Sequence, residues 1–198
     1  SDVYKRQENV VFSVPSGNFG NLTAGIIAKR MGLPIKKFIA STNINKTVPE
    51  YLRSGVFSTS SSVQTISNAM DVGNPSNFER VLDLFHHSFD KVKDAIIGFY
   101  FSDDETRSAM QQMYSKFNYV VDPHGAVGYF GLMNYLNIHP EKKGICLGTA
   151  HPAKFLDVVK PILNTNVKIP KRLQSFITKK KKSVQISNSY KDFINWIL

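Results

Sequence analysis

The most informative segment of the chain reads Val14-Pro15-Ser16-Gly17-Asn18-Phe19-Gly20-Asn21. It follows the apolar run Val10 to Phe12 and leads into a helical pattern from Leu22 to Met31. A strand, a tight glycine turn and a helix start in this order expose backbone N–H groups that have no acceptor within the helix, and the helix dipole adds partial positive charge. The glycines lack the Cβ atoms that would keep an anion away. The segment therefore predicts a phosphate-binding loop.

The motif differs from two common phosphate loops. It has no Gly-Lys-Ser/Thr, which the nucleoside-triphosphate loop requires, and it lacks the GxGxxG spacing of dinucleotide-binding turns. Asn18 and Asn21 can supply or orient hydrogen bonds without a charge that would repel a phosphate. A glycine-rich turn without a ligand remains the alternative, because short glycine motifs also match by chance.

The rest of the chain alternates between strand and helix patterns, which predicts an α/β fold. We expect strands at residues 10–14, 35–40, 119–121 and 144–147, and helices at 22–31, 78–89, 103–114, 126–136, 153–163 and 190–198. Residues 91–100 fit either a helix or a strand. Residues 42–62 are polar and rich in turn formers, and we expect an ordered loop there. Ser102 and Glu105 have the spacing of a capping box.

Composition describes an ordinary globular chain of 198 residues, with 42% hydrophobic residues and a mean hydropathy of -0.20. No apolar run is long enough to span a bilayer, and no secretory leader is visible, so no membrane partner is expected. The single Cys146 cannot form an internal disulfide, which favours a reducing, cytoplasmic setting. The five histidines show no metal-ligand spacing, so no metal site is expected.

The formal net charge of +10 is densest in the run Lys179 to Lys182. A basic run of this kind is either a nucleic-acid contact or a solvated turn. The aromatic side chains are not interleaved with the basic ones, as they are in a base-stacking surface. The sequence therefore favours the solvated turn, and we expect no nucleic-acid partner.

The string Ser-Gly-Asn-Phe-Gly-Asn resembles the phosphate-binding loop of threonine synthases, which are pyridoxal-phosphate (PLP) enzymes of the tryptophan-synthase-β-like fold. The resemblance continues to Gly55 and returns in three further ordered blocks. These are SNAMDVGNPSNFERV (67–81), DPHGAVGY (122–129) and LGTAHPAKF (147–155). It implies the fold-type II architecture of PLP enzymes, a three-layer α/β arrangement around a parallel sheet, with this chain as its C-terminal part.

The resemblance also implies roles for individual residues. The PLP phosphate would be held by the backbone N–H groups of Gly17, Asn18, Phe19, Gly20 and Asn21. Thr149 would place a neutral hydroxyl beside the pyridine nitrogen and leave that nitrogen unprotonated. The alternative for Thr149 is a hydroxyl that caps the following helix. Candidates for the substrate pocket are Asn68, Asp71, His151 and Lys154. His124 lies in one of the blocks that resemble the family, and its alternative to a ligand role is structural, as a turn residue bonded to the backbone.

The chain lacks the lysine that carries the cofactor in this family. There the lysine lies in a Phe-Lys-Asp context upstream of the phosphate loop, and no such tripeptide occurs here. We therefore expect no catalytic residue in this chain. We expect residues 8–198 to be the C-terminal portion of the PLP-binding domain, with 168–198 as a tail, and the missing N-terminal half to be its partner.

Residues 1–7 have a different expected origin. Asp2 to Gln7 back-translates to GATGTGTATAAGAGACAG, which resembles a transposon end used in DNA library preparation. We expect residues 1–7 to be a sequencing scar and exclude them from the fold. The alternative is a short, polar, natural leader.

The family reaction converts O-phospho-L-homoserine and water into L-threonine and phosphate, with PLP as the electron sink. Two alternatives stay open. One is another PLP-dependent elimination enzyme such as a serine/threonine dehydratase, although those enzymes have phosphate loops denser in glycine. The other is a threonine-synthase-like protein that binds without turnover. Without the lysine, the isolated chain is expected to be inactive and to expose an apolar surface where the N-terminal half would dock.

Overall fold

The structure is a computed structural model that describes residues 10–177 and 179–198. The chain separates into two units, Ser1–Val167 and Lys168–Leu198. Residues 1–7, the expected scar, lie outside the described residues. The larger unit carries all the residues for which a ligand role is expected.

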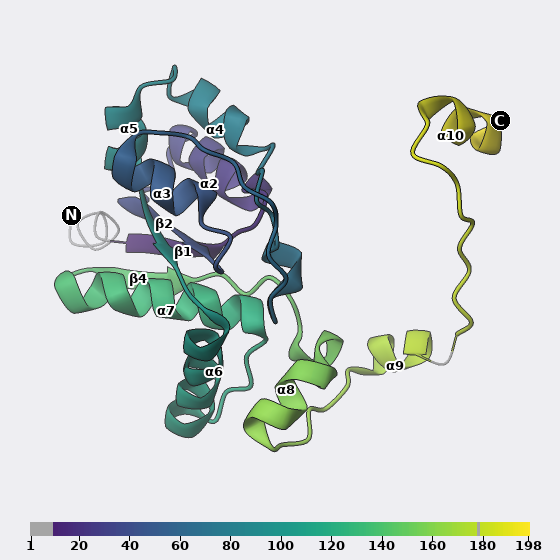
Figure 1. Ribbon diagram of the computed structural model, residues 1–198. Coiled ribbons are helices and arrows are strands. Elements are labelled where there is room, and N and C mark those ends of the chain that lie inside the picture. The colour runs from purple at the N-terminus through teal and green to yellow at the C-terminus, as the bar shows by residue number, and fades with distance from the viewer. Residues whose placement is uncertain (1–9, 178) are drawn as a thin grey trace. The chain divides into compact units, whose positions relative to one another are not determined.

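Four parallel strands form the centre of the larger unit, in the order β3-β2-β1-β4 (Figure 1). The strands are β1 (Val10–Pro15), β2 (Lys37–Thr42), β3 (Ile96–Tyr100) and β4 (Lys143–Cys146). Strands β2 and β3 are added one after the other on one side of β1, and β4 then pairs with the other side of β1. The prediction of an α/β fold with a parallel sheet is therefore confirmed.

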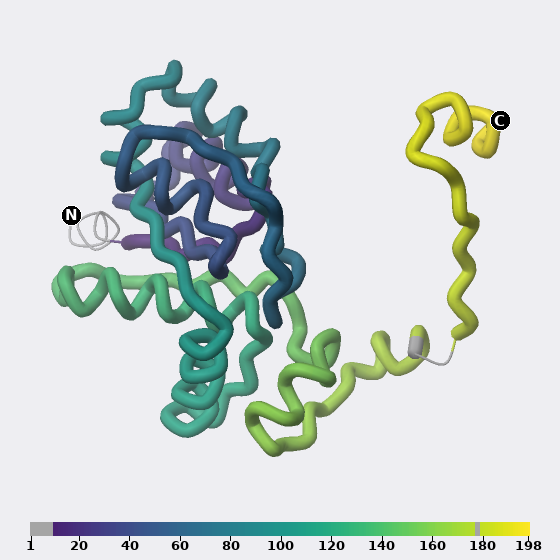
Figure 2. The backbone as a smooth tube through the Cα atoms, viewed as in Figure 1, coloured from purple at the N-terminus to yellow at the C-terminus, as the bar shows by residue number. Residues whose placement is uncertain are grey.

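Helices cover both faces of this sheet and give three layers (Figures 1 and 2). On one face lie α2 (Gly20–Arg30), α3 (Thr47–Ser54), α4 (Phe78–Leu84) and α5 (Phe89–Ala95), and on the other lies α7 (Pro123–Ile138). Alternation along β2 explains both faces. Phe38 and Ala40 pack with the α2 side, whereas Ile39 packs with Leu132 and Tyr135 of α7.

Helix α7 lies unusually close to the sheet because its facing residues are glycines. A Cβ atom on Gly131 would lie 2.0 Å from Ser41 Oγ, and one on Gly128 would lie 2.9 Å from Cys146 Sγ. The short distance also lets Ser13 Oγ donate a hydrogen bond of 2.6 Å to the Gly128 carbonyl. Gly128, which belongs to the DPHGAVGY block, and Gly131, which follows that block, thus hold α7 against the sheet.

Two further helices complete the larger unit. They are α6 (Asp103–Phe117) and α8 (Leu156–Leu163), with the short 3₁₀ turns η1 (Asn68–Met70) and η2 (Pro152–Lys154). The expected capping box of α6 is confirmed, since Ser102 Oγ accepts from the Glu105 N–H at 3.3 Å and the Ser102 N–H donates to Glu105 Oε2 at 2.8 Å. The ambiguous residues 91–100 contain both elements, the end of α5 and then β3.

Three sequence predictions about elements were wrong. Residues 42–62 contain helix α3, because Val48, Tyr51 and Leu52 have helical spacing and are buried. The expected helix 78–89 is interrupted at His86 and His87, whose φ angles of 53° and 54° are left-handed, so these residues lie in a turn between α4 and α5. Residues 119–121 form no strand, since they connect α6 to α7 without a neighbouring strand.

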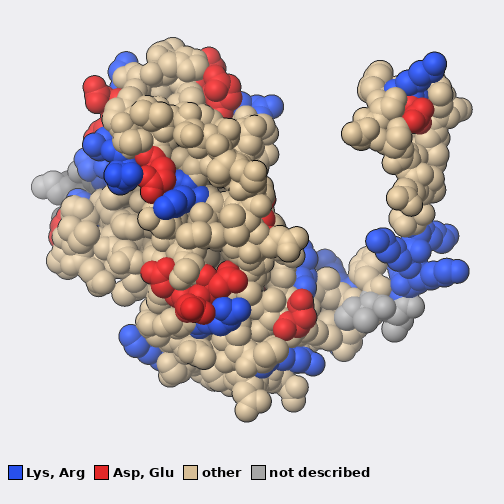
Figure 3. Space-filling model, viewed as in Figure 1, with Lys and Arg blue, Asp and Glu red and all other residues tan. Residues whose placement is uncertain are grey.

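The smaller unit contains α9 (Lys171–Ile177) and α10 (Tyr190–Ile197). Lys179 to Lys182 lie between them, are exposed and form the densest basic cluster of the view in Figure 3. Within residues 10–177 and 179–198, no helix is both long and apolar enough to cross a membrane.

Candidate functional site

Two loops begin side by side at the carboxyl ends of β1 and β4. Residues 16–21 follow β1, and residues 147–151 follow β4, with the Leu147 N–H donating to the Ser13 carbonyl at 3.0 Å. The direction in which strands are added reverses between β1 and β4. Open α/β sheets bind ligands outside the carboxyl ends of their strands at such a reversal. The topology therefore places a candidate ligand site between these two loops.

The loop after β1 presents a row of unpaired backbone donors. Within the described part of the chain, five consecutive N–H groups have no acceptor, those of Gly17, Asn18, Phe19, Gly20 and Asn21. They precede and open α2, where the first N–H groups of a helix have no partner and the helix dipole is positive. Such a row of donors binds anions, and phosphate most commonly.

Buried aromatic packing holds the loop in its shape. Phe19 adopts a left-handed conformation, with φ 65° and ψ 15°, which is uncommon for a residue with a side chain. Its ring is buried and meets the ring of Phe78 edge-on, with the centroids 5.5 Å apart. The Phe19 side chain therefore packs the loop in place.

The two asparagine side chains orient the loop. Asn21 Oδ1 accepts from Ser16 Oγ at 2.7 Å, and Asn21 Nδ2 donates to the Pro15 carbonyl at 2.9 Å. Asn18 Oδ1 accepts from the Asn77 N–H at 3.2 Å, which ties the loop to the start of α4. Because both side chains bond within the protein, the groups of this loop that remain available to a ligand are its backbone N–H groups.

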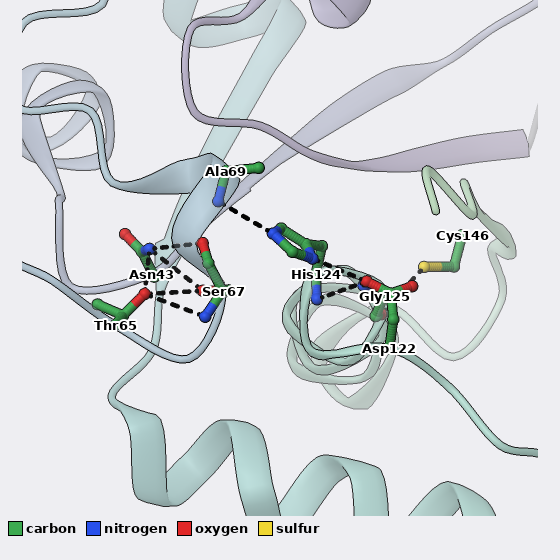
Figure 4. Close-up of polar contacts among 8 residues, drawn as sticks. All are labelled: Asn43, Thr65, Ser67, Ala69, Asp122, His124, Gly125 and Cys146. Atoms are coloured by element: carbon green, nitrogen blue, oxygen red, sulfur yellow. Dashed lines mark hydrogen bonds and ion pairs between the residues drawn. The ribbon is translucent and has the colours of Figure 1, made fainter. Parts of the chain in front are cut away.

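The turn η1 forms the wall behind the loop. A Cβ atom on Gly17 would lie 2.7 Å from Met70 Cα and 2.9 Å from the Ala69 carbonyl oxygen, so only glycine fits at this position. Asn68 lies on the same turn and is exposed. Asp71 follows it, and its carboxylate already accepts from Thr65 Oγ1 at 2.7 Å and Asn43 Nδ2 at 2.8 Å. Figure 4 shows Asn43 and Thr65 in this polar cluster at the end of β2.

The loop after β4 carries three more of the expected residues. Thr149 is exposed, and within the described chain its hydroxyl makes no hydrogen bond. The alternative that Thr149 caps the next helix was wrong, because His151 caps η2 and its Nδ1 accepts from the Ala153 N–H at 3.1 Å. Lys154 ends η2 and is exposed. The described residues contain no group of three or more His, Cys, Asp or Glu side chains placed to hold a metal.

Comparison with known proteins shows what this arrangement is similar to. Residues 125–197 match the family of threonine synthase C-terminal domains. A threonine synthase of Haemophilus influenzae is 49% identical over 169 residues, which are 85% of this chain and 39% of that protein. The chain belongs to the threonine synthase family. It spans well under half the length of that relative, and the family model that it matches is described as C-terminal.

Solved threonine synthases share the fold as well. The crystal structure of the Escherichia coli threonine synthase matches with a TM-score of 0.87 and 39% sequence identity, covering 97% of this chain and 44% of that chain. A PLP-bound threonine synthase from Brucella melitensis matches with a TM-score of 0.80 and 31% identity, covering 95% of this chain and 45% of that chain. The threonine synthase family is thereby favoured over the dehydratase alternative.

The single cysteine of this threonine synthase family member lies beside the site but is not reactive. Cys146 ends β4, and its Sγ lies 3.9 Å from the Gly125 carbonyl oxygen. Burial, and secondarily the charge of Asp122, raises the pKa of the Cys146 thiol from 9.0 to about 12. A thiol that keeps its proton is a poor nucleophile, so Cys146 is a packing residue.

The raised pKa of Cys146 predicts a loss of stability in alkali. Between pH 9 and about 12 the native thiol keeps its proton while the unfolded thiol loses it, so the native state binds more protons. The free energy of unfolding should therefore fall as the pH rises through this range. Urea unfolding of the chain and of Cys146→Ala at pH 8, 9.5 and 10.5 measures this contribution as the difference between the two. Parallel pH profiles would contradict it.

Proposed function

We propose that the chain is the C-terminal part of a PLP-dependent threonine synthase that converts O-phospho-L-homoserine and water into L-threonine and phosphate. The observation that carries the proposal is the row of five unpaired backbone N–H groups at the reversal point of the sheet. A phosphate monoester is a compact dianion, and it suits backbone donors at the start of a helix. Because the chain belongs to the threonine synthase family, the phosphate compound proposed for this anion site is PLP.

The residues present fit the phosphate end and the ring end of PLP. The backbone N–H groups of Gly17 to Asn21 would hold the phosphate, with no basic side chain needed. Thr149 would place its free hydroxyl at the ring nitrogen, because it follows the neighbouring strand β4 at the same edge of the sheet. PLP supplies an electron sink for negative charge that develops on substrate carbons. A neutral threonine would not protonate the ring nitrogen, so the ring would stabilise this negative charge less strongly than a protonated ring does.

The substrate side of the proposal involves exposed residues near the same edge. Lys154 would attract the substrate phosphate, and His151 and Asn68 would line the pocket. Asp71 is proposed to act differently from the other three. Its carboxylate already accepts hydrogen bonds from Thr65 and Asn43, so it would shape the pocket wall rather than bind substrate.

The missing N-terminal part is the proposed partner. A groove of about 510 Å³ lies over the sheet between α2 and β4, with apolar lining from Phe12, Val14, Ile145 and Leu147. Strand β4 is one of the two outer strands of the described sheet, and Ile145 on it is 44% exposed. Open strand edges and apolar grooves are normally covered. We propose that the N-terminal part covers them, supplies the lysine that anchors the cofactor, and acts with this chain in the cytoplasm.

The test is a chimera in which residues 10–198 follow the N-terminal part of the Escherichia coli threonine synthase. We expect the chimera to bind PLP and to release phosphate and threonine from O-phospho-L-homoserine, while the isolated chain releases none. Coupled assays for phosphate and for threonine measure both products.

Substitutions of Thr149 provide the matched control for the chimera. Thr149→Ser keeps a hydroxyl at the ring nitrogen and should retain phosphate release. Thr149→Val keeps the shape without the hydroxyl and should lower kcat by about tenfold or more, because a polar ring atom loses its partner. A chimera that binds PLP but releases ammonia from serine, or turns nothing over, would overturn the proposed reaction.

A further inference from the structure

A buried histidine connects three separate parts of the site. His124 is 3% exposed and lies in the first turn of α7. Its Nδ1 lies 2.8 Å from Asp122 Oδ1, and its Nε2 lies 3.2 Å from the backbone nitrogen of Ala69 (Figure 4). Its ring also packs against that of Phe155, with the centroids 4.7 Å apart. His124 is therefore more than the backbone-bonded turn residue that the sequence suggests.

The hydrogen bonds fix which ring nitrogen carries the proton. Ala69 donates its N–H, so Nε2 of His124 must accept and is not protonated. The proton then lies on Nδ1 and is donated to Asp122. The same carboxylate oxygen of Asp122 accepts from the His124 N–H at 2.9 Å, which caps α7. Asp122 thus orients the ring so that a lone pair faces η1.

The turn η1 depends on this lone pair for its position. A 3₁₀ turn of three residues has weak internal hydrogen bonds, and its first N–H groups have no partner inside it. The His124 ring supplies an acceptor for one of them, the Ala69 N–H, from a different helix. Ala69 and Met70 are also the residues whose backbone atoms lie against Gly17.

We propose that His124 is a positioning residue for the phosphate-binding loop, acting through the backbone of η1. The inference rests on the proposed function, because the loop matters only if it binds the PLP phosphate. The order of contacts is Asp122 to His124, His124 to Ala69, and η1 to Gly17. Without the ring acceptor, η1 is free to shift. The backbone of η1 then no longer holds the loop from Gly17 to Asn21 in a fixed position.

The test uses two neutral substitutions in the chimera that differ only in where an amide oxygen can lie. In His124→Gln the side chain can reach the place of Nε2 and accept from Ala69, whereas in His124→Asn it is too short. We expect His124→Asn to weaken PLP binding by about tenfold or more, and His124→Gln to stay within about threefold of the parent. Pyridoxal, which has no phosphate, is the probe that separates loop geometry from general damage. Its affinity should be the same in the parent and both variants.

A second measurement keeps the inference separate from the proposed function. Hydrogen exchange at the Ala69 amide of the 198-residue chain should speed up in His124→Asn and not in His124→Gln. If the parent chimera fails to bind PLP, the proposed function fails, and the exchange data alone decide whether His124 holds η1. Equal losses in the two variants, parallel losses for PLP and pyridoxal, or unchanged exchange at Ala69 would each overturn the positioning role.

Discussion

Replacing Gly17 by alanine in the chimera is expected to lower PLP affinity by about 100-fold, which corresponds to about 2.7 kcal/mol. The added Cβ would lie 2.7 Å from Met70 Cα and 2.9 Å from the Ala69 carbonyl oxygen, and both are backbone atoms that cannot rotate away. The loop or η1 must therefore move, and the five N–H groups can then no longer all reach one bound phosphate. Titration of the visible PLP absorption measures the affinity.

The matched control is Gly98→Ala, in β3. Its added Cβ would also lie 2.7 Å from a backbone atom, the Cα of Pro49 in α3, but on the far strand of the sheet. We expect it to lower the free energy of unfolding, as overpacking does, and to leave PLP affinity within about threefold. If Gly98→Ala weakens PLP binding as much as Gly17→Ala does, backbone strain at the loop is not the cause.

Replacing Phe78 by alanine is expected to lower the free energy of unfolding by about 3–5 kcal/mol. Phe78 is fully buried at 0% exposure, and its ring lies edge-on to Phe19 and Tyr51 and stacks on Phe57, with centroids 5.5 to 5.7 Å apart. Its removal leaves a cavity and releases the ring of Phe19, whose left-handed backbone needs that packing. Urea unfolding of the chain measures the loss.

The control for Phe78 is Phe117→Ala at the end of α6. The Phe117 side chain is 61% exposed and touches the Tyr129 ring only at a centroid distance of 6.4 Å. We expect a loss below about 1 kcal/mol, as for most exposed substitutions. Similar losses in the two variants would show that the aromatic cluster around Phe78 is not a main source of stability.

The sequence predicts features whose signals are local. The strand, turn and helix of the predicted phosphate loop were found because its glycines lie directly between an apolar strand and an apolar helix face. The capping box at Ser102 was found because both partners lie within four residues. Helix α3 was missed because its polar residues and Pro49 suggest a loop, and only packing shows that Val48, Tyr51 and Leu52 share a buried face.

Features that depend on distant contacts could not be predicted in the same way. His86 and His87 interrupt a helical pattern with left-handed φ angles, although neither glycine nor proline marks the break in the sequence. The partner of His124 is Ala69, 55 residues away, and no spacing rule connects the two. The capping role of His151 was also missed, since serine, threonine, aspartate and asparagine are the residues expected at a helix start.

The return of β4 to the side of β1 also sets the order in which the chain can organise itself. β1 and β2 pair across a single helix, whereas β4 reaches β1 only after the chain has passed through β3, α6 and α7. Closing a longer loop loses more chain entropy, by about 0.6 kcal/mol for each doubling of its length. We therefore expect the edge that carries Thr149 to be the last part of the sheet to assemble, so that the candidate ligand site forms only in chains that have finished folding.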